Sequence, residues 1–207
     1  MSIVVATLAQ VEPGKGPHRV WLGSDGRSVR GGVPGVVPIK WVRGHPTWWV
    51  GVSGDLRAQQ VLEQDRAAWC SALSISELIR RLRLTLVRHQ CREDDNGEAG
   101  FPTCGQSFLV AQGDGGRCGD GERLYEVDSS FAYVEVPVGG YAAEGSGRKF
   151  ALGAMYAETR RAGDHPGPMN LLTLGLKAAA SFDVMCGRPF MVWRAFSDTG
   201  PVERPVL

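Results

Sequence analysis

The chain has 207 residues, enough for one domain of ordinary size with a substantial core. Its 23 lysines and arginines nearly balance its 22 aspartates and glutamates, and no basic stripe typical of nucleic-acid binding is present. No apolar run has the length of a membrane helix, and residues 1–10 lack the features of a secretory signal. We therefore expect one domain over residues 1–207, located in the cytoplasm, with no nucleic-acid or membrane partner.

The cysteines predict a reducing compartment. There are five of them, an odd number with no CxxC pair, so we expect mostly free thiols. A zinc site formed by Cys91, Cys104 and Cys118 is the alternative, but their spacing matches no common zinc pattern. We expect neither a metal nor a cofactor.

The first part of the chain is predicted to form strands. Residues 3–8 are apolar and rich in β-branched side chains, which is typical of a strand buried on both faces. Residues 20–23 return as a second strand after a turn rich in glycine and proline, so the two form a hairpin. Two further strands are expected over residues 39–42 and 48–52.

Two helices are expected next. The first is predicted over residues 56–68, with Asp55 as its N-cap. Ser74 and Glu77 form a capping box for the second helix. Apolar residues of this second helix recur at helical spacing on one face, while most of its arginines lie on the other. The apolar face consists of Ile75, Leu78, Ile79, Leu82 and Leu86.

A polar, glycine-rich loop over about residues 89–106 precedes the second part of the chain. Strand patterns follow at residues 107–111, 124–127 and 132–136, and a last strand is expected at residues 190–195. This part also contains two predicted helices.

The first of these two helices ends near Arg161, and the second covers residues 170–180. The second is apolar nearly all round, so we expect it to be buried. A polar tail occupies about residues 197–207. The order of strands and helices favours an α+β domain over a parallel βαβ sheet.

The stretch YAAEGSGRKFALG, residues 141–153, places Ser146 between two glycines where a strand changes into a helix. Glycine allows backbone angles that other residues avoid and lets another segment come close. At such a turn, backbone N–H groups and a hydroxyl can point at a reacting centre. Taken alone, the pattern is equally that of an ordinary tight connection.

Other polar residues also lie at the ends of predicted elements, and each has a simple structural explanation. Asp25 before a glycine is typical of a turn, and Lys40 in a short strand is typical of an edge that avoids aggregation. Asp183 could cap a helix, and Gly54 could belong to a turn.

In order and in spacing, however, these residues resemble the active site of the proteasome β-subunit and the bacterial HslV-type peptidase, which are N-terminal-nucleophile hydrolases. The resemblance runs from about residue 2 to residue 195. It implies a four-layer αββα sandwich of two antiparallel sheets flanked by helices. The matching segments are VWLGSDGR at 20–27, PIKW at 38–41, VSGDLR at 52–57, LYEVDSS at 124–130, EGSGRKFALG at 144–153 and SFDVMCGR at 181–188.

The resemblance implies that the chain hydrolyses peptide bonds with the hydroxyl of its mature first residue. Removal of Met1 would expose Ser2, whose own α-amine acts as the base because it titrates near pH 8 and is partly neutral at pH 7. Lys40 would stabilise negative charge on the nucleophile, and Asp25 would hold that lysine in place.

The remaining roles follow from the same resemblance. The N–H of Gly54 would form the oxyanion hole. Ser146 and Asp183 would orient the α-amine and relay its proton. The family usually has a serine three residues after this aspartate, but this chain has Cys186, which is a poorer hydrogen-bond donor.

The first residue departs from the family, which has threonine there. Ser2 lacks the methyl group that restricts the threonine rotamer, so we expect a less well-placed nucleophile. Thr7, exposed after loss of a short propeptide ending at Ala6, is the alternative nucleophile. We rank it second because that cleavage would remove most of the first strand.

The resemblance also implies partners. We expect a homo-oligomeric ring or double ring, acting on peptides or unfolded proteins supplied by a separate ATPase unfoldase. The chain itself has no Walker motif. The alternative is a catalytically inactive subunit of the same fold with a structural or assembly role, for instance in a phage virion.

Overall fold

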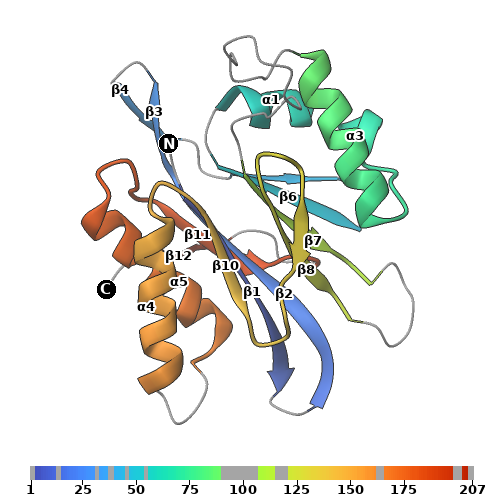
Figure 1. Cartoon of the computed structure of the whole chain (residues 1–207). Helices are drawn as coiled ribbons and strands as arrows, with labels where there is room; N and C mark the ends of the chain where they lie inside the picture. The colour runs from blue at the N-terminus through green and yellow to red at the C-terminus, as the bar shows by residue number, and fades with distance from the viewer. Residues whose placement is uncertain are drawn as a thin grey trace.

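Two five-stranded antiparallel sheets form the centre of the structure (Figure 1). The strand orders are β10-β1-β2-β11-β12 in the first sheet and β5-β6-β7-β8-β9 in the second. Every pairing in both sheets is antiparallel, which confirms the predicted α+β class. The computed structural model describes residues 3–12, 15–30, 33–36, 40–44, 47–53, 56–89, 107–114, 121–161, 166–197 and 202–204.

The first sheet is built on the predicted N-terminal hairpin. Its two strands are longer than expected and pair from Val4 opposite Ser24 to Glu12 opposite Lys15. The last strand of this sheet, β12, was not expected, because three residues in a polar tail give little strand signal. The strands are β1 (Ile3–Glu12), β2 (Lys15–Asp25), β10 (Tyr141–Gly145), β11 (Phe190–Arg194) and β12 (Val202–Arg204).

The second sheet confirms the strands expected in the middle of the chain. A separate hairpin, β3–β4, was missed because its glycine- and proline-rich sequence is unfavourable for strands. The sheet strands are β5 (Trp41–Arg43), β6 (Trp48–Val52), β7 (Phe108–Gln112), β8 (Arg123–Val127) and β9 (Tyr133–Glu135), and the hairpin strands are β3 (Arg27–Arg30) and β4 (Val33–Val36).

The helix expected over residues 56–68 is in fact two helices, which corrects the prediction. The helical ladder is interrupted at Asp65, whose ψ of 27° lies outside the helical range. The short second helix buries Trp69 completely and lets its indole N–H donate to the Leu62 carbonyl at 2.9 Å. The helices are α1 (Leu56–Gln64), α2 (Arg66–Trp69), α3 (Ile75–Arg88), α4 (Arg148–Arg161) and α5 (Pro168–Phe182).

Helix α3 begins at the predicted cap. The Ser74 hydroxyl accepts a hydrogen bond from the Glu77 N–H at 3.2 Å. The Glu77 carboxylate accepts from the Leu73 N–H at 2.9 Å, one residue earlier than a standard capping box. The predicted apolar face is buried except for Ile75, which is partly exposed.

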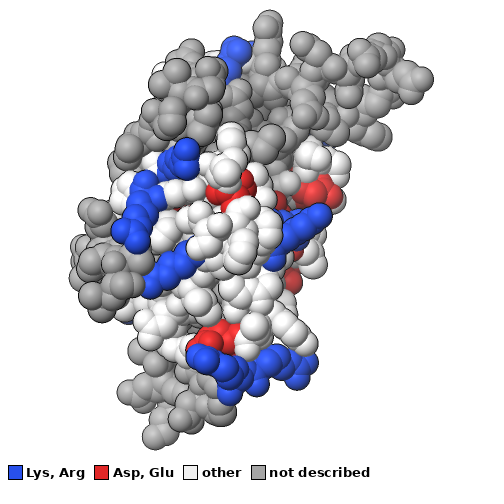
Figure 2. All heavy atoms as spheres, turned by 90° about the vertical axis from the view of Figure 1, so that its left-hand side faces the viewer, with Lys and Arg blue, Asp and Glu red and all other residues white. Residues whose placement is uncertain are grey.

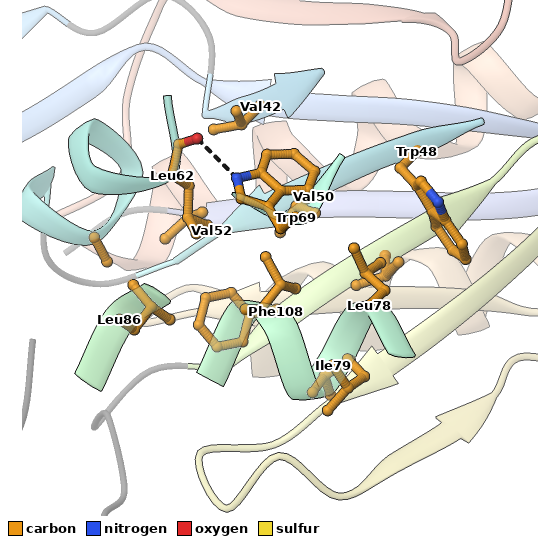
Figure 3. Packing of buried hydrophobic residues seen from close by; sticks show 14 of the residues in the cluster. Val42, Trp48, Val50, Val52, Leu62, Trp69, Leu78, Ile79, Leu86 and Phe108 are labelled. Atoms are coloured by element: carbon orange, nitrogen blue, oxygen red, sulfur yellow. Dashed lines mark hydrogen bonds between the residues drawn. The ribbon is translucent and has the colours of Figure 1, made fainter. Parts of the chain in front are cut away.

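One apolar core lies between the second sheet and helices α1–α3. Figure 3 shows Trp69, Phe108 and Leu78 packed together in this core, with the Trp69 indole bonded to Leu62. The burial of large aromatic and aliphatic side chains is the main force that holds these helices on the sheet.

The other two cores lie on opposite faces of the first sheet, and alternation along β1 explains them. Val4 and Ala6 point into a core that also contains Leu109 of the second sheet. Ile3 and Val5 point the other way, into a core shared with helices α4 and α5. The prediction that this strand is buried on both faces is therefore confirmed.

Helices α4 and α5 pack against each other on the outer face of the first sheet (Figure 1). Figure 2 shows this side of the molecule, where basic side chains lie around a central area of uncharged ones. Within the described part of the chain, no helix has the length and apolar character needed to span a lipid bilayer.

Candidate active site

Asp25 and Lys40 form a buried ion pair at the end of the first hairpin. The Lys40 ammonium donates to Asp25 Oδ1 and, at 2.6 Å, to the Arg27 carbonyl. The Asp25 side chain is inaccessible to solvent and that of Lys40 is 4% exposed. Two backbone N–H groups complete the carboxylate shell: Ile3 donates to Oδ1 and Gly187 to Oδ2, each at 2.9 Å.

Burial changes the acidity of both members of this pair. Removal from water raises the pKa of Asp25 and lowers the pKa of Lys40, because desolvation disfavours each charged form. The attraction between the two groups opposes both shifts. The result is a lysine that gives up its proton more readily than an exposed one, at a position almost fully shielded from water.

The first described residue of β1 contacts this pair directly. The Ile3 N–H, which belongs to the peptide bond that joins residues 2 and 3, donates to the same carboxylate oxygen that Lys40 binds. Thr7 lies four residues further along the strand, where its hydroxyl donates to the Gly140 carbonyl at 2.8 Å. Four residues of strand are about 13 Å, so Thr7 lies away from the pair.

The turn at residues 145–147, here called the serine turn, is where the sequence analysis expected it, between β10 and α4. Gly145 has a φ of 123°, a conformation that favours glycine. Gly147 lies so close to α5 that a Cβ atom there would be 2.7 Å from the Ala179 Cβ and 2.8 Å from the Cys186 Sγ. Both glycines are therefore required by the geometry that presents Ser146.

The next part of the site is a group of three side chains, those of Ser146, Asp183 and Cys186. The Cys186 Sγ is 3.4 Å from Asp183 Oδ2 and 3.9 Å from the Ser146 hydroxyl, so the thiol contacts both groups. Asp183 itself ends α5, and its carboxylate accepts from the Met185 N–H at 2.9 Å.

The pKa values of Cys186 and Asp183 are shifted in opposite directions. Burial first, and then the nearby Asp25 and Asp183 carboxylates, raise the pKa of Cys186 to about 12, so its thiol is neutral at physiological pH. Burial raises the pKa of Asp183, but hydrogen bonds from Ser146, Met185 and Cys186 outweigh it and leave this pKa below its ordinary value. Asp183 is therefore an anion that accepts hydrogen bonds.

The segment after α5 joins the two halves of the site. Cys186 contacts Ser146 and Asp183, and the next residue, Gly187, donates its N–H to Asp25. On the other side, β1 and β10 pair with Ile3 opposite Gly145. Four of the six predicted site residues, Asp25, Lys40, Ser146 and Asp183, are thus brought to one end of the first sheet.

Several predictions concern residues outside the described ranges. Ser2 and Gly54 are among them, as are Met1 and the three cysteines considered for zinc, and most of the predicted loop at residues 89–106. Within the described ranges, no cluster of three or more histidine, cysteine or acidic side chains is arranged to hold a metal ion.

Sequence reasoning missed four groups in or beside the site. The Arg27 carbonyl and the Gly187 N–H are backbone groups, so side-chain identity gives no signal for them. Glu144 and Arg148 lie within the quoted serine-turn motif, but their pairing depends on how the strand and helix meet. Only the presence of a glutamate at the end of an apolar strand could have drawn attention to that position.

Comparison with known proteins supports the fold. No family model and no curated protein sequence matches the chain. Two solved structures of Thiobacillus denitrificans BPH, one of them in complex with epoxomicin, are similar to it. Each has 20% sequence identity and a TM-score of 0.66; the matches cover 92% of this chain and 97% and 96% of the other chains. At this identity, the similarity shows that this chain shares their fold.

Proposed function

We propose that this protein is a proteasome-like peptidase subunit of the N-terminal-nucleophile class, with Ser2 as its nucleophile. One observation carries the proposal: the Lys40 ammonium and the Ile3 N–H meet on one buried oxygen of Asp25. Because Ser2 is covalently bonded to the Ile3 nitrogen, only a few bonds separate its hydroxyl from that nitrogen. We therefore expect the hydroxyl close to the buried lysine. That proximity is what activation of an N-terminal hydroxyl requires.

Each described residue has a role in the proposed reaction. Lys40, with a pKa lowered by burial, favours ionisation of the Ser2 hydroxyl and stabilises the resulting charge, and Asp25 holds it in position. The free α-amine of Ser2 accepts the hydroxyl proton and later delivers it to the leaving amine. Ser146 and Asp183 orient that amine, and the Gly54 N–H stabilises the tetrahedral oxyanion.

The finer features of the fold and the partners are part of the same proposal. Three apolar cores separated by two sheets are consistent with a four-layer αββα sandwich. One of the similar structures holds epoxomicin, a proteasome inhibitor. We propose that this chain likewise acts on peptides or unfolded proteins, assembles as a ring or double ring, and receives substrate from a separate ATPase unfoldase.

The proposal is tested at the N-terminus. Intact-mass spectrometry is expected to show loss of Met1, and an epoxyketone such as epoxomicin is expected to label Ser2 and inhibit peptide hydrolysis. Ser2→Ala abolishes both labelling and hydrolysis, whereas Thr7→Val, which removes a hydroxyl elsewhere on the same strand, keeps both. Peptide hydrolysis by protein that fully retains Met1 would contradict the mechanism.

The inactive structural subunit is the other outcome of this experiment. Cys186 favours it, because the position at which the resembled peptidases usually have a serine is here a neutral thiol, which is a poorer hydrogen-bond donor to Asp183. Retained Met1, no labelling and no hydrolysis would together assign the chain a structural role.

A further inference from the structure

Glu144 is a buried acid that the proposed mechanism does not use. It is the last side chain of β10 before the serine turn, and its side chain is only 9% exposed. It pairs with Val4 of β1 and so points into the space between the two sheets. A carboxylate in an apolar layer destabilises the fold unless it is paired, so its presence there calls for an explanation.

The charged groups around Glu144 come from α4 and from β8, and an uncharged hydroxyl comes from the residue before β7. Arg148, at the start of α4, places one guanidinium nitrogen 3.4 Å from Glu144 and another 3.7 Å from Glu126 of β8. Asp128 adds negative charge from the end of β8, and Ser107, before β7, donates a side-chain hydrogen bond to Glu144. The β1 neighbour is apolar, so Arg148 is the one cation among these groups.

This arrangement encloses the serine turn. Glu144 immediately precedes the turn and Arg148 immediately follows it, so their ion pair closes a loop of five residues that has Ser146 at its centre. The contact of Arg148 with Glu126 ties the same loop to the second sheet. Ser107 extends this link, because its carbonyl accepts a hydrogen bond from Ser53, the neighbour of Gly54.

We propose that Glu144 and Arg148 form a clamp that positions Ser146 in the proposed active site, and that the clamp loosens when Glu144 loses its proton. This inference rests on the proposed peptidase for its kinetic consequence, but not for its structural one. Glu144 and Arg148 are positioning residues: they contact the turn and the second sheet, while Ser146 contacts the site.

The acidity of Glu144 makes this clamp responsive near neutral pH. Burial raises its pKa from 4.5 to about 7, against the attraction of Arg148, and the nearby Glu126 and Asp128 raise it further. Below this pH Glu144 is neutral and stays between the sheets without the cost of a buried charge. Above it, the carboxylate is charged, and opening of the turn becomes easier because opening returns that charge to water; the attraction of Arg148 reduces this effect without cancelling it.

The kinetic test compares Glu144→Gln with Glu158→Gln. The control removes an ion pair of the same helix, Glu158 with Arg161, at the end far from the serine turn. At pH 8 we expect Glu144→Gln, which keeps this position neutral, to raise kcat several-fold with little change in KM, and to remove an inflection near pH 7 from the pH profile of kcat. Arg148→Gln should lower kcat at pH 8, because it leaves the Glu144 carboxylate without its cation, and the double variant should regain the lost activity.

Hydrogen exchange gives a readout that does not depend on activity. At pH 8, amides of residues 145–151, including those of Phe150 and Ala151 that donate to the Gly147 carbonyl, should exchange about 10-fold more slowly in Glu144→Gln than in the unmodified protein. At pH 6 the two proteins should exchange alike.

The two measurements separate the clamp from the proposed function. If the unmodified protein hydrolyses no peptide yet shows the exchange difference, the clamp stands and the peptidase proposal fails. If exchange at pH 8 is unchanged in the variant, or if the inflection near pH 7 survives in an active variant, the clamp is refuted.

Discussion

Lys40 is the only described lysine whose side chain is buried, and every contact of its ammonium is an oxygen of the site. A buried ammonium that loses its partner, or a carboxylate that loses its ammonium, is costly, so Asp25 and Lys40 must be considered together. The Asp25–Lys40 pair therefore contributes both to the stability of the fold and to the proposed chemistry.

Replacement of this lysine is therefore expected to affect both properties. Lys40→Met leaves the Asp25 carboxylate buried without its cation, so we expect a loss of about 3 kcal/mol in the free energy of unfolding. Peptide hydrolysis should fall at least about 100-fold, because the charge that stabilises the nucleophile is gone. Chemical denaturation and a peptidase assay measure the two effects. Lys149→Met, at an exposed position of α4, is the matched control and should change neither.

Cys186 lies where the peptidases that this sequence resembles usually have a serine. Cys186→Ser replaces a weak thiol donor by a hydroxyl in contact with Ser146 and Asp183. We expect a several-fold rise in kcat/KM for a peptide substrate and a change in unfolding free energy of about 1 kcal/mol or less. An equal or lower rate in a variant of unchanged stability would show that the thiol is not the weak point of the relay.

Glu144 gives a pH dependence whose sign follows from its pKa. The folded protein holds this proton up to about pH 7, while the unfolded chain releases it near 4.5, so the folded state binds more protons in this window and stability falls as pH rises through it. In Glu144→Gln this position does not ionise, so the loss of stability at high pH is absent. We expect it to be more stable than the unmodified protein at pH 8, by at most about 3 kcal/mol, and little different at pH 4.5. Urea denaturation at both values provides the test, and a larger gain at the lower pH would contradict the assignment.

At the scale of elements, the packing of α4 on α5 fixes the serine turn. Gly147 and Gly175 both lie where the two helices meet: a Cβ atom would be 2.7 Å from the Ala179 Cβ at the first position and 3.1 Å from the Met155 side chain at the second. The Ala179 Cβ is fixed to the backbone of α5, so it cannot move unless the helix moves. Met155 has a flexible side chain that can adjust.

This difference predicts unequal effects of the same substitution. Gly147→Ala should destabilise the fold by about 1–3 kcal/mol, because α4 must shift away from α5. The shift also moves Ser146 relative to Cys186, so hydrolysis should fall. Gly175→Ala, in the middle of a helix where alanine is favoured, should be near neutral or stabilising. Thermal denaturation of both variants tests this, and a greater loss for Gly175→Ala would show that the turn is not held by this contact.

At the scale of the whole molecule, the proposed ring needs a surface through which copies associate. The rings of Phe150 and Phe182 stack 5.4 Å apart beside the serine turn although their side chains lie on the surface, and Val184 is exposed nearby in the sequence. They belong to the α4–α5 side of the molecule, the side with uncharged side chains at its centre (Figure 2). Exposed aromatic clusters of this kind are often sites of association.

We expect sedimentation to detect an assembly larger than a single chain, and Phe182→Glu to shift it toward the monomer. Leu73→Glu is the control, since Leu73 is even more exposed than Phe182 but lies just before α3, a helix that packs on the second sheet. A monomeric unmodified protein would contradict the proposed ring, and an unchanged assembly in Phe182→Glu would place the contact elsewhere.

The sequence by itself determined the elements whose signals are local. The N-terminal hairpin, the capped helix α3 and the strand-to-helix change around Ser146 follow from β-branched runs, a cap and flanking glycines, all of which act within a few residues. Asp25 and Lys40 were singled out by the resemblance, from their order and spacing together with Gly54, Ser146 and Asp183.

Only the tertiary structure decided which of these residues meet. The break at Asp65, the β3–β4 hairpin and the addition of β12 depend on contacts between distant segments. So do the place of Cys186 beside Ser146 and the pairing of Arg148 with both Glu144 and Glu126. The physical reason is that burial and electrostatic pairing are properties of a site's surroundings, and those surroundings come from strands and helices far apart in the sequence.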